Sequence, residues 1–373
     1  MNLLSYLSSL PYNFVYLCLD QFLDINLPQL PNFYSISPIT LKINLSLKNT
    51  GVFIENQKTI DYLQNLANST NKKNIIIPFK PSGKIEKICQ KYQWIYAANS
   101  SKLNRFFEDK IKFPTICSLK NIPIIPHLIT TFTSDNINQA FEKFQTPLVI
   151  QSHFGWAGNS TFFLKNFQPL LPDNTPIKIS PYLSGYTLLN NCCLVDSHLF
   201  QSPPALQFTG IKKLTDNPFT TVGRQWPANI SSSIKSQVLE ITNSFGEILK
   251  ENHYRGFFGL DFFVNQNKVY LLECNPRLTA SFSFYTQLEI QASLNPLFYF
   301  HLLSFIPHNF NISDQQENQR FNQELIGAQL NLKNKQQTTI YQYNFDHQLV
   351  DQPENFQEIP EVYINKLLND HKQ

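Results

Sequence analysis

The part of the sequence that most constrains the fold is residues 254–278, where two strand-like runs enclose a short polar segment. Residues 257–264 and 269–272 are mainly aromatic, aliphatic and β-branched, and the polar tetrapeptide 265–268 between them has the composition of a turn. This pattern predicts a β-hairpin. The few polar side chains inside the hairpin are therefore the residues that need an explanation.

These polar side chains recur at alternate positions in the second half of the hairpin. Side chains alternate between faces along a strand, so Glu273, Asn275 and Arg277 share one face if the strand continues past residue 272. Whether Asp261 joins them depends on the turn. A three-residue loop over 266–268 places Asp261 opposite Glu273, whereas a loop of two or four residues places it opposite residue 272 and separates the two acids.

Two carboxylates that converge with an amide oxygen form a site made only of oxygen ligands, which suits a hard cation. Mg²⁺ accepts one or two carboxylates and completes its octahedron with water and substrate phosphates. The adjacent Arg277 is either the salt-bridge partner of these acids or a planar clamp for a phosphoryl or carboxyl group. The alternative interpretation is an edge hairpin whose acids face water.

The composition is that of a globular protein with enough apolar residues for two or three domains. Hydrophobic residues make up 42% of the chain and aromatic residues 14%, which provides a sizeable core. The net charge is +3, and no block of basic residues stands out, so we expect no nucleic-acid partner. The first forty residues contain no Lys or Arg, unlike a signal peptide, and the apolar run 294–307 is too short to span a bilayer. We therefore expect no membrane segment.

Cysteine and glycine usage add two further expectations. The six cysteines form no C-x-x-C pair or other metal-binding spacing, which indicates buried thiols of a reducing compartment and a cytoplasmic location. Cys274 lies between two polar-face residues and should therefore point toward the core rather than act as a nucleophile. Only 11 glycines occur, and eight of them lie between residues 155 and 259. Because a rare glycine tends to mark a special backbone position, the functional surface should lie in this region.

Along the chain, residues 1–98 have the pattern of a separate α/β unit with an open, partly parallel sheet. The expected elements are strands at 14–19 and 74–78 and helices at 60–67 and 84–92. Next comes a helix at 103–110 with Lys110 on its polar side. From this local pattern alone, Lys110 is interpreted as a solvated surface charge. A further helix at 134–144 has Ser134 as its N-cap.

The remaining chain alternates strand signals with two long helical patterns. A strand, a glycine-containing loop and a second strand occupy residues 147–164, and such a loop either binds phosphate or serves as a hairpin turn. We expect further strands at 177–183, 327–332 and 338–343, and strand or loop segments at 188–199, 207–214 and 220–225. Helices are expected at 231–250, where residues 231–233 offer N-caps, and at 288–305.

The order of these segments resembles the ATP-grasp superfamily, in particular its carboxylate-amine ligase and biotin-carboxylase-like members. The residues that carry the resemblance are Lys110, the strand 149–151 followed by the loop 155–161, the segment 180–183, Gly259-Leu260-Asp261-Phe262 and Glu273-Cys274-Asn275-Pro276-Arg277. The resemblance covers about residues 100–305. It implies an ATP-grasp fold of mixed α/β and α+β class, with a Rossmann-like pre-ATP-grasp domain at 1–98, the ATP-grasp domain at 99–309 and a C-terminal extension at 310–373 packed on it.

The resemblance also implies a role for each matching residue. Asp261, Glu273 and Asn275 would hold Mg²⁺, or Mn²⁺ in its place, while Arg277 would bind an acyl-phosphate intermediate or a substrate carboxylate. Lys110 would reach the ATP phosphates. The remaining implied nucleotide contacts come from Gln151, from Gly155, Gly158 and Ser160 in the loop, and from Ser180, Pro181 and Leu183 at the adenine. Lys212 or Arg224 would supply a cation to the transition state.

One departure from the family pattern concerns Gln151, which stands where a lysine normally contacts the nucleotide phosphates. A neutral amide still donates hydrogen bonds, but charge-assisted contacts are about twice as strong. Ser180, where an acid is common, is a second departure. Lys178, Lys212 and Arg224 are the candidates to replace the missing charge.

Two functions follow from this resemblance. The first is an ATP-dependent ligase that joins a small-molecule carboxylate to an amine or a thiol through an acyl phosphate, with ATP and Mg²⁺ as cofactors. The alternative is a catalytically degenerate ATP-binding module that acts as a sensor or scaffold. A homo-oligomer is compatible with either function, and the sequence does not identify the substrates.

Overall fold

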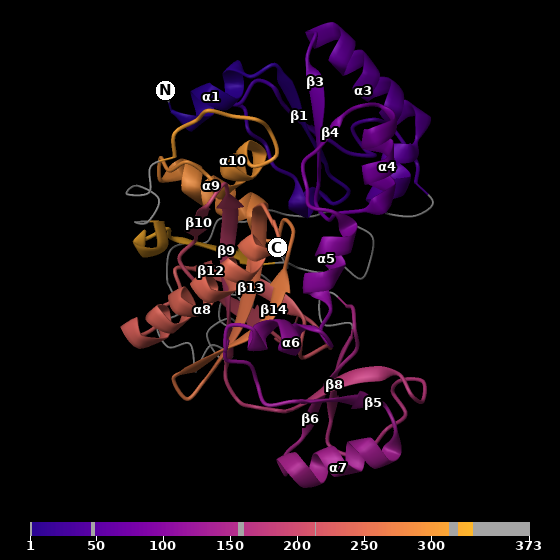
Figure 1. The fold of residues 1–373 in the computed structure, drawn as a ribbon, viewed down its shortest axis with the longest axis vertical. Helices are drawn as coiled ribbons and strands as arrows, with labels where there is room; N and C mark the ends of the chain where they lie inside the picture. The colour runs from indigo at the N-terminus through magenta and orange to yellow at the C-terminus, as the bar shows by residue number, and fades with distance from the viewer. Residues whose placement is uncertain (1, 46–48, 156–159, 213, 313–319, 331–373) are drawn as a thin grey trace, which may run out of the picture.

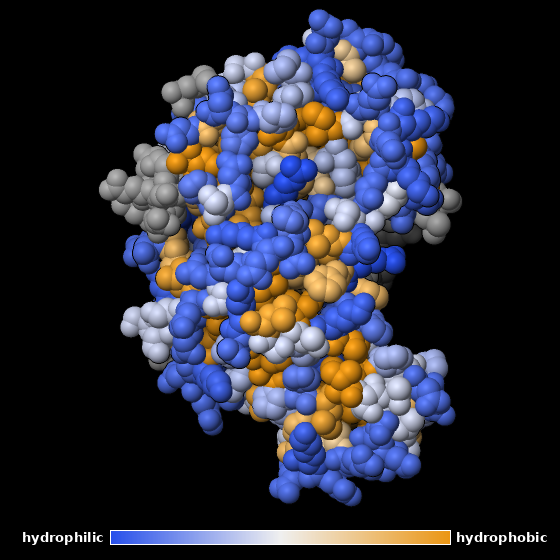
Figure 2. All heavy atoms as spheres, viewed as in Figure 1, coloured by the Kyte–Doolittle hydropathy of each residue, from blue (hydrophilic) through white to orange (hydrophobic). Residues whose placement is uncertain are grey.

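The computed structural model describes residues 2–45, 49–155, 160–212, 214–312 and 320–330. Three sheets follow one another along the long axis of the molecule, with the N-terminal unit at one end, a large sheet in the middle and a small sheet beside α7 at the other end (Figure 1). In the same view hydrophilic residues cover the outer parts of the N-terminal unit and the end near α7, and apolar residues gather toward the middle (Figure 2).

The N-terminal unit is an open α/β sheet in which every neighbouring pair of strands is parallel. Its strand order is β2-β1-β3-β4. The strands are β1 (Tyr12–Leu17), β2 (Phe33–Ile36), β3 (Lys73–Pro78) and β4 (Ile95–Tyr96), and the helices are α1 (Leu3–Ser9), η1 (Gln21–Leu23), α2 (Thr50–Glu55), α3 (Gln57–Thr70) and α4 (Gly83–Lys91). The predicted α/β arrangement is present, although the sequence interpretation missed α1, α2, β2 and β4.

Two short helices connect this unit to the rest of the chain. Helix α5 (Ser101–Glu108) has Ser100 as its N-cap and ends before Asp109, and α6 (Phe113–Ser118) follows. The expectation that Lys110 lies on the polar side of a helix is therefore wrong. Lys110 lies in the connection after α5, and only 8% of its surface is exposed.

The small sheet has the antiparallel order β5-β8-β6-β7 and is covered on one face by α7. It consists of β5 (Leu128–Thr131), β6 (Leu148–Gln151), β7 (Thr161–Leu164) and β8 (Pro176–Pro181). Helix α7 (Ser134–Phe144) has Thr133 as its N-cap, because the Thr133 hydroxyl accepts a hydrogen bond from the Asn136 amide. This corrects the prediction that Ser134 is the cap.

The large sheet has seven strands in the order β14-β13-β9-β11-β12-β15, with β10 paired to β9. Its strands are β9 (Tyr186–Val195), β10 (His198–Gln201), β11 (Ala205–Thr209), β12 (Thr221–Trp226), β13 (Gly256–Asn265), β14 (Lys268–Asn275) and β15 (Gly327–Leu330). Helix α8 (Ser232–Glu251), capped by Ser231, packs its apolar side into the core of this sheet. The predicted strand at 338–343 lies outside the described residues.

The predicted hairpin is β13–β14, and its register differs from the simple expectation. The turn contains only Gln266 and Asn267, both with positive φ, as a type I′ turn requires. A regular ladder from this turn would pair Asp261 with Leu272. A β-bulge shifts the register between Asp261 and Phe262, so that Asp261 pairs with Glu273. The acids therefore stay together despite the two-residue turn, because β14 contains one unpaired residue, Leu272, at the bulge.

The helical segment predicted at 288–305 is two helices. Helix α9 (Phe282–Gln291) ends before Ser293, which has a positive φ of 57°, and α10 (Leu297–Leu303) begins after Pro296. Both pack in one apolar cluster with the N-terminal unit, and the Tyr16 ring lies 5.4 Å from the Phe282 ring. The 3-10 helix η2 (Arg320–Asn322) lies near β10. In the described part of the chain no helix is long and apolar enough to cross a membrane.

Candidate functional site

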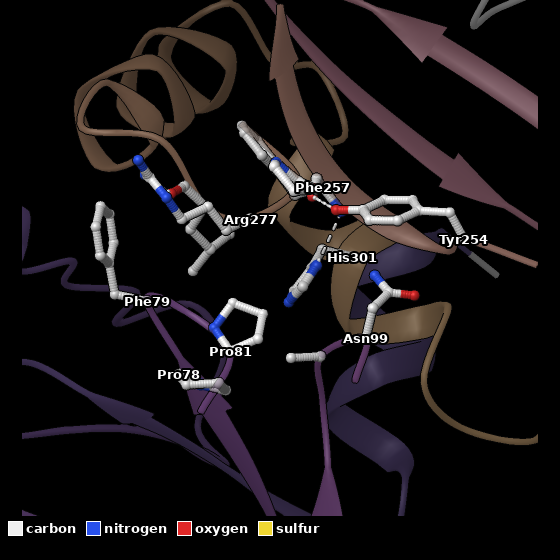
Figure 3. Close-up of a pocket in the computed structure, with 11 residues that line it drawn as sticks. Pro78, Phe79, Pro81, Asn99, Tyr254, Phe257, Arg277 and His301 are labelled. Carbon is white, nitrogen blue, oxygen red and sulfur yellow. Dashed lines mark hydrogen bonds between the residues drawn. The ribbon is translucent and has the colours of Figure 1, made fainter. Parts of the chain in front are cut away.

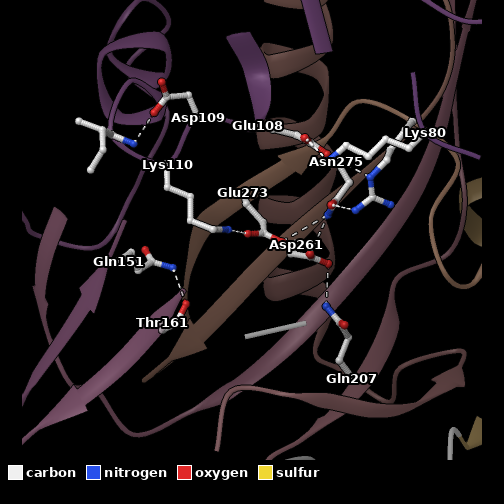
Figure 4. Close-up of polar contacts among 12 residues, drawn as sticks. Lys80, Glu108, Asp109, Lys110, Gln151, Thr161, Gln207, Asp261, Glu273 and Asn275 are labelled. Atoms are coloured by element: carbon white, nitrogen blue, oxygen red, sulfur yellow. Dashed lines mark hydrogen bonds and ion pairs between the residues drawn. The ribbon is translucent and has the colours of Figure 1, made fainter. Parts of the chain in front are cut away.

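Side chains of the hairpin converge on one another across the bulge (Figure 4). The Asn275 Nδ2 group donates to Asp261 Oδ2 at 3.0 Å and lies 3.5 Å from Glu273 Oε1. The two acids therefore lie on the same face, with one oxygen of each directed at the same donor group. This arrangement contradicts the alternative in which the acids of the hairpin are separated by the turn.

Asp261 is held by neighbouring strands of the large sheet. Gln207 on β11 donates from Nε2 to Asp261 Oδ1 at 2.7 Å, and the Thr221 hydroxyl on β12 donates to Gln207 Oε1 at 3.3 Å. Burial raises the pKa of Asp261 to about 7, the negative charge of Glu273 adds to this rise, and the cation of Arg224 opposes it. Asp261 is thus a carboxyl group that a nearby positive charge would ionise.

Glu273 has the opposite electrostatic environment because it has a direct cationic partner. The Lys110 ammonium forms an ion pair with Glu273 Oε2. Burial alone would raise the pKa of Glu273, but Lys110, Asp261 and Arg277 together outweigh burial, and the pKa falls to about 2. Lys110 is further fixed by its backbone N–H, which donates to the His153 carbonyl at 3.0 Å. That bond joins the connection after α5 to the segment following β6.

Arg277 lies at the edge of this cluster, toward the N-terminal unit. It donates from Nε to Glu108 at 3.1 Å, from Nη1 to the Leu278 carbonyl at 3.0 Å and from Nη2 to Asn275 Oδ1 at 2.9 Å. Glu108 also pairs with Lys80 at 2.7 Å. The partner of Arg277 is therefore Glu108 rather than the two hairpin acids. Three of its five N–H donors are used, which leaves two for an anion.

A small pocket lies beside Arg277 (Figure 3). The end of β3 contributes Phe79, whose ring lies 5.3 Å from the Arg277 guanidinium carbon. Helix α10 contributes His301, which accepts a hydrogen bond from the Phe257 amide at 3.0 Å. The pocket is lined by Pro78, Phe79, Pro81, Ala98, Asn99, Tyr254, Phe257, Pro276, Arg277, Leu278 and His301.

The small sheet turns one face to α7 and the other toward the hairpin acids. Ile150 and Ile179 are buried in the cluster that includes α7 residues. The alternating neighbours Gln151 and Lys178 therefore lie on the opposite face, directly across from each other in the β6–β8 ladder. Gln151 donates to the Thr161 hydroxyl at 3.3 Å.

Both ends of the predicted glycine loop lie within the described residues. Gly155 approaches Ser160 so closely that a Cβ at position 155 would lie 1.8 Å from the Ser160 hydroxyl oxygen, so only glycine fits there without a shift. The Ser160 carbonyl accepts from the Ser152 amide at 3.2 Å, which closes the base of the loop. Gly158 lies outside the described residues.

The segment predicted to contact adenine lies at the end of β8. Ser180 and Pro181 are buried, Leu183 is half-buried, and the Tyr182 amide donates to the Pro147 carbonyl at 2.7 Å. Tyr182 is 45% exposed and contacts the Phe163 ring edge-on at 4.9 Å between centroids. An apolar ring therefore flanks this segment.

The two residues expected to supply an additional cation lie in different surroundings. Arg224 on β12 is half-buried, and burial lowers its pKa while Asp261 opposes that change. Arg224 therefore belongs to the cluster electrostatically. Lys212 is exposed after β11, and among the described residues no contact joins it to the hairpin acids. The structure thus groups Arg224, but not Lys212, with the predicted site.

The chemistry of these donors fits Mg²⁺. The convergent Asp261 and Glu273 oxygens provide two anionic ligands, and Asn275 provides a neutral amide beside them. Over the described ranges no group of three or more His, Cys, Asp or Glu side chains could hold a metal. A two-carboxylate set is what Mg²⁺ uses when substrate phosphates complete its coordination.

Sequence reasoning missed several residues of this cluster. Gln207 was considered only for its spacing from Lys212, although a polar residue within the apolar run 205–208 was a signal for a buried partner. Glu108 and Lys80 carried no local signal, because their roles depend on Arg277, which lies far away in sequence.

Comparison with known proteins defines the class. The ATP-grasp domain family matches residues 97–281, a range that contains the small sheet, the hairpin and the acid cluster. Residues 97–281 therefore form an ATP-grasp domain, and the predicted fold class is confirmed. No curated protein matches the chain in sequence. The domain limits predicted at residues 98 and 309 stay a prediction.

Three solved structures illustrate the shared fold. The N5-carboxyaminoimidazole synthetase of Staphylococcus aureus in complex with ADP has a TM-score of 0.53 at 14% identity and covers 79% of both chains. The carboxyaminoimidazole ribonucleotide synthase of Aspergillus clavatus in complex with ATP has a TM-score of 0.55 at 14% identity, covering 82% of this chain and 79% of that one. The biotin carboxylase of Campylobacter jejuni in a β,γ-ATP complex has a TM-score of 0.55 at 13% identity, covering 79% of this chain and 64% of that one. At these identities the likeness concerns the fold.

Proposed function

We propose that this protein is an ATP-dependent ligase that joins a small-molecule carboxylate to an amine, or to a thiol, through an acyl-phosphate intermediate. The observation that carries the proposal is the paired acids Asp261 and Glu273, faced by the cations Lys110 and Arg224. The matched ATP-grasp domain contains this cluster. Neighbours of the same fold are described as complexes with ADP or ATP.

The electrostatics of the cluster suit a polyphosphate. Asp261, Glu273 and Asn275 would hold Mg²⁺, which would neutralise phosphate charge and bridge the acids to the nucleotide. Lys110, which already pairs with Glu273, would add a direct contact to a phosphate oxygen. Because these charges are fixed before the nucleotide arrives, little reorganisation is needed when negative charge develops during transfer.

The nucleotide would lie between the small sheet and the hairpin. We assign the adenine to the end of β8, where the Pro181 carbonyl can accept and the Leu183 N–H can donate a hydrogen bond. Proline has no N–H, so its carbonyl is its only polar backbone group. The loop from Gly155 to Ser160 would close over the phosphates, since backbone without a Cβ can approach an anion closely.

The proposed chemistry has two steps. A carboxylate oxygen of the first substrate attacks the γ-phosphorus of ATP, the bond from that phosphorus to the β–γ bridging oxygen breaks, and ADP leaves. The amine or thiol then attacks the acyl carbon, phosphate departs with the bonding pair, and the nucleophile loses its proton. Positioning and charge neutralisation are the protein's contributions to such a reaction.

Arg277 is suited to the acyl group in both steps. Its two remaining N–H donors lie beside the pocket that Phe79 and His301 help to line. The planar guanidinium can bind a carboxylate and then the acyl phosphate formed from it. Glu108 fixes the orientation of this guanidinium at 3.1 Å.

Release of ADP from MgATP tests the proposal directly. The purified chain is incubated with a panel of carboxylates, each combined with a panel of amines and thiols, and ADP and phosphate are measured. We expect ADP formation that requires one particular carboxylate, and more with its matching nucleophile. Hydroxylamine traps the acyl phosphate as a hydroxamate. No ADP with any pair, together with no MgATP binding in calorimetry, refutes the proposal.

A further inference from the structure

We propose that Lys178 on β8 supplies the cation through which the small sheet binds the nucleotide phosphates. This inference rests on the proposed function and names a residue of the same site. Its basis is the register of the small sheet together with the charges around the hairpin acids. The opposite position on β6 holds the neutral Gln151.

The ladder between β6 and β8 fixes where the Lys178 side chain lies. Gln151 pairs with Lys178, and Ile150 pairs with Ile179. Residues directly opposite in an antiparallel pair share a face. Because the two isoleucines are buried on the α7 side, Gln151 and Lys178 both face away from α7. A cation at either position reaches the same side of the sheet.

The neighbours of Lys178 show that this side faces the hairpin acids. Burial, together with the nearby Lys110, lowers the pKa of Lys178 to about 8, and Glu273 on β14 opposes the change. The ammonium group is therefore within electrostatic reach of the Lys110–Glu273 ion pair. Within the described residues it has no hydrogen-bond or ion-pair partner of its own.

A half-buried ammonium group without a partner is costly unless a ligand pairs with it. Glu273 is already paired with Lys110, and Asp261 receives hydrogen bonds from Gln207 and Asn275. The positive charge of Lys178 is therefore in excess at this face of the sheet. An anion bound between the small sheet and the hairpin would offset that excess, and a nucleotide polyphosphate has the length to contact both.

An exchange of charge across the ladder tests this assignment. The variants are Lys178→Gln, Gln151→Lys and the double variant that combines them, with Lys178→Arg as the conservative change. Lys165→Gln is the matched control, because Lys165 is an exposed lysine directly after β7 of the same sheet. Calorimetry measures the affinity of each chain for MgATP and for adenosine, and thermal unfolding checks that each variant is folded.

We expect Lys178→Gln to lose about 10- to 100-fold in MgATP affinity, the range for one charge-assisted hydrogen bond. Adenosine affinity should stay within about threefold, because adenosine has no phosphate. The double variant should recover most of the loss, since its lysine projects from the opposite residue on the same face. Lys178→Arg and Lys165→Gln should bind nearly as the unmodified chain does. Removal of an unpaired cation should leave the unfolding temperature unchanged or higher.

Two results overturn the inference. One is unchanged MgATP affinity in Lys178→Gln. The other is an equal loss for MgATP and adenosine with a lower unfolding temperature and no recovery in the double variant, which is the signature of a structural role. Failure of the proposed function looks different, because the unmodified chain then neither binds MgATP nor releases ADP. If the unmodified chain binds MgATP and releases ADP, and the Lys178→Gln variant binds MgATP equally well, only the assignment of Lys178 is overturned.

Discussion

Substitution of Asp261 by Asn should stabilise the folded chain at pH 8 and remove its response to MgATP. Asp261 is held where burial and the charge of Glu273 raise its pKa from 3.8 to about 7. Above pH 7 the folded protein therefore holds an ionised group in an unfavourable place. A cation bound beside Asp261 would offset this cost.

The size of the effect follows from the displacement of the pKa. Each pKa unit corresponds to about 1.4 kcal/mol, so a rise from 3.8 to about 7 gives a limit of about 4 kcal/mol. Solvent screening of this half-buried group reduces that value. The variant also loses about 1 kcal/mol, because its amide N–H₂ would face the Asn275 Nδ2 donor in place of the acceptor Oδ2. We expect a net gain of about 1–2 kcal/mol at pH 8.

The sign of the pH dependence follows from the direction of the shift. A carboxyl whose pKa is raised on folding binds its proton more tightly in the folded state, so its contribution to stability falls as the pH rises. For Asp261 the fall covers about pH 4 to pH 7. The variant should therefore be no more stable than the unmodified chain at pH 4 and should exceed it at pH 8.

Urea unfolding followed by tryptophan fluorescence at pH 4, 6 and 8, with EDTA present, measures this difference. The same chains are then heated with and without saturating MgATP, which should stabilise only the unmodified chain, by about 2.7 kcal/mol at 100 times the dissociation constant. Asp173→Asn, an exposed acid, is the control for charge alone. An Asp261→Asn chain that is less stable at pH 8 and still responds to MgATP would refute the reasoning.

Three further predictions concern buried ionisable residues. Lys110→Met leaves Glu273 without its cation and should cost about 2–3 kcal/mol in urea unfolding as well as most of the MgATP affinity; an unchanged unfolding midpoint would contradict the ion pair. Burial lowers the pKa of His301 to about 3, so the unmodified chain should lose about 3 kcal/mol of stability between pH 7 and pH 4. The His301→Phe variant should not show this loss, and the same change of unfolding free energy with pH in both chains would contradict the prediction. Arg320→Met removes the cation that pairs with the buried Glu289 and should cost about 3–5 kcal/mol, part of which a second Glu289→Leu change should restore.

The sequence predicted those parts of the site that depend on local pattern. The hairpin, its polar face and the long α8 helix follow from alternation, turn composition and capping, and all three are present. Family resemblance added the order of the segments. The break between α9 and α10 also had a local signal, Pro296, which precludes a continuous helix through that point. Its omission was an error of interpretation rather than a limit of the sequence.

The rest depends on contacts between distant residues. The helical pattern at 103–110 does not reveal that α5 ends at Glu108, so Lys110 looked like a surface charge. Its burial follows from a partner 163 residues away. Likewise, turn length alone would have separated the hairpin acids, and nothing local marks Leu272 as the residue that bulges. Bulges depend on how a strand fits its neighbours in the sheet.

Strand register therefore determines where the charges of this site lie. In the large sheet one extra residue in β14 brings Glu273 opposite Asp261, and without it the acids would face opposite sides. In the small sheet a regular ladder brings Lys178 opposite Gln151. Comparison with the family motif along the sequence finds no lysine at position 151. In an antiparallel ladder, however, a long, flexible side chain on the directly opposite residue of the neighbouring strand can reach the same place. If Lys178 replaces the family lysine in this way, Gln151 does not indicate a degenerate site. The positive charge then lies on the neighbouring strand but on the same face of the sheet, where a phosphate would bind.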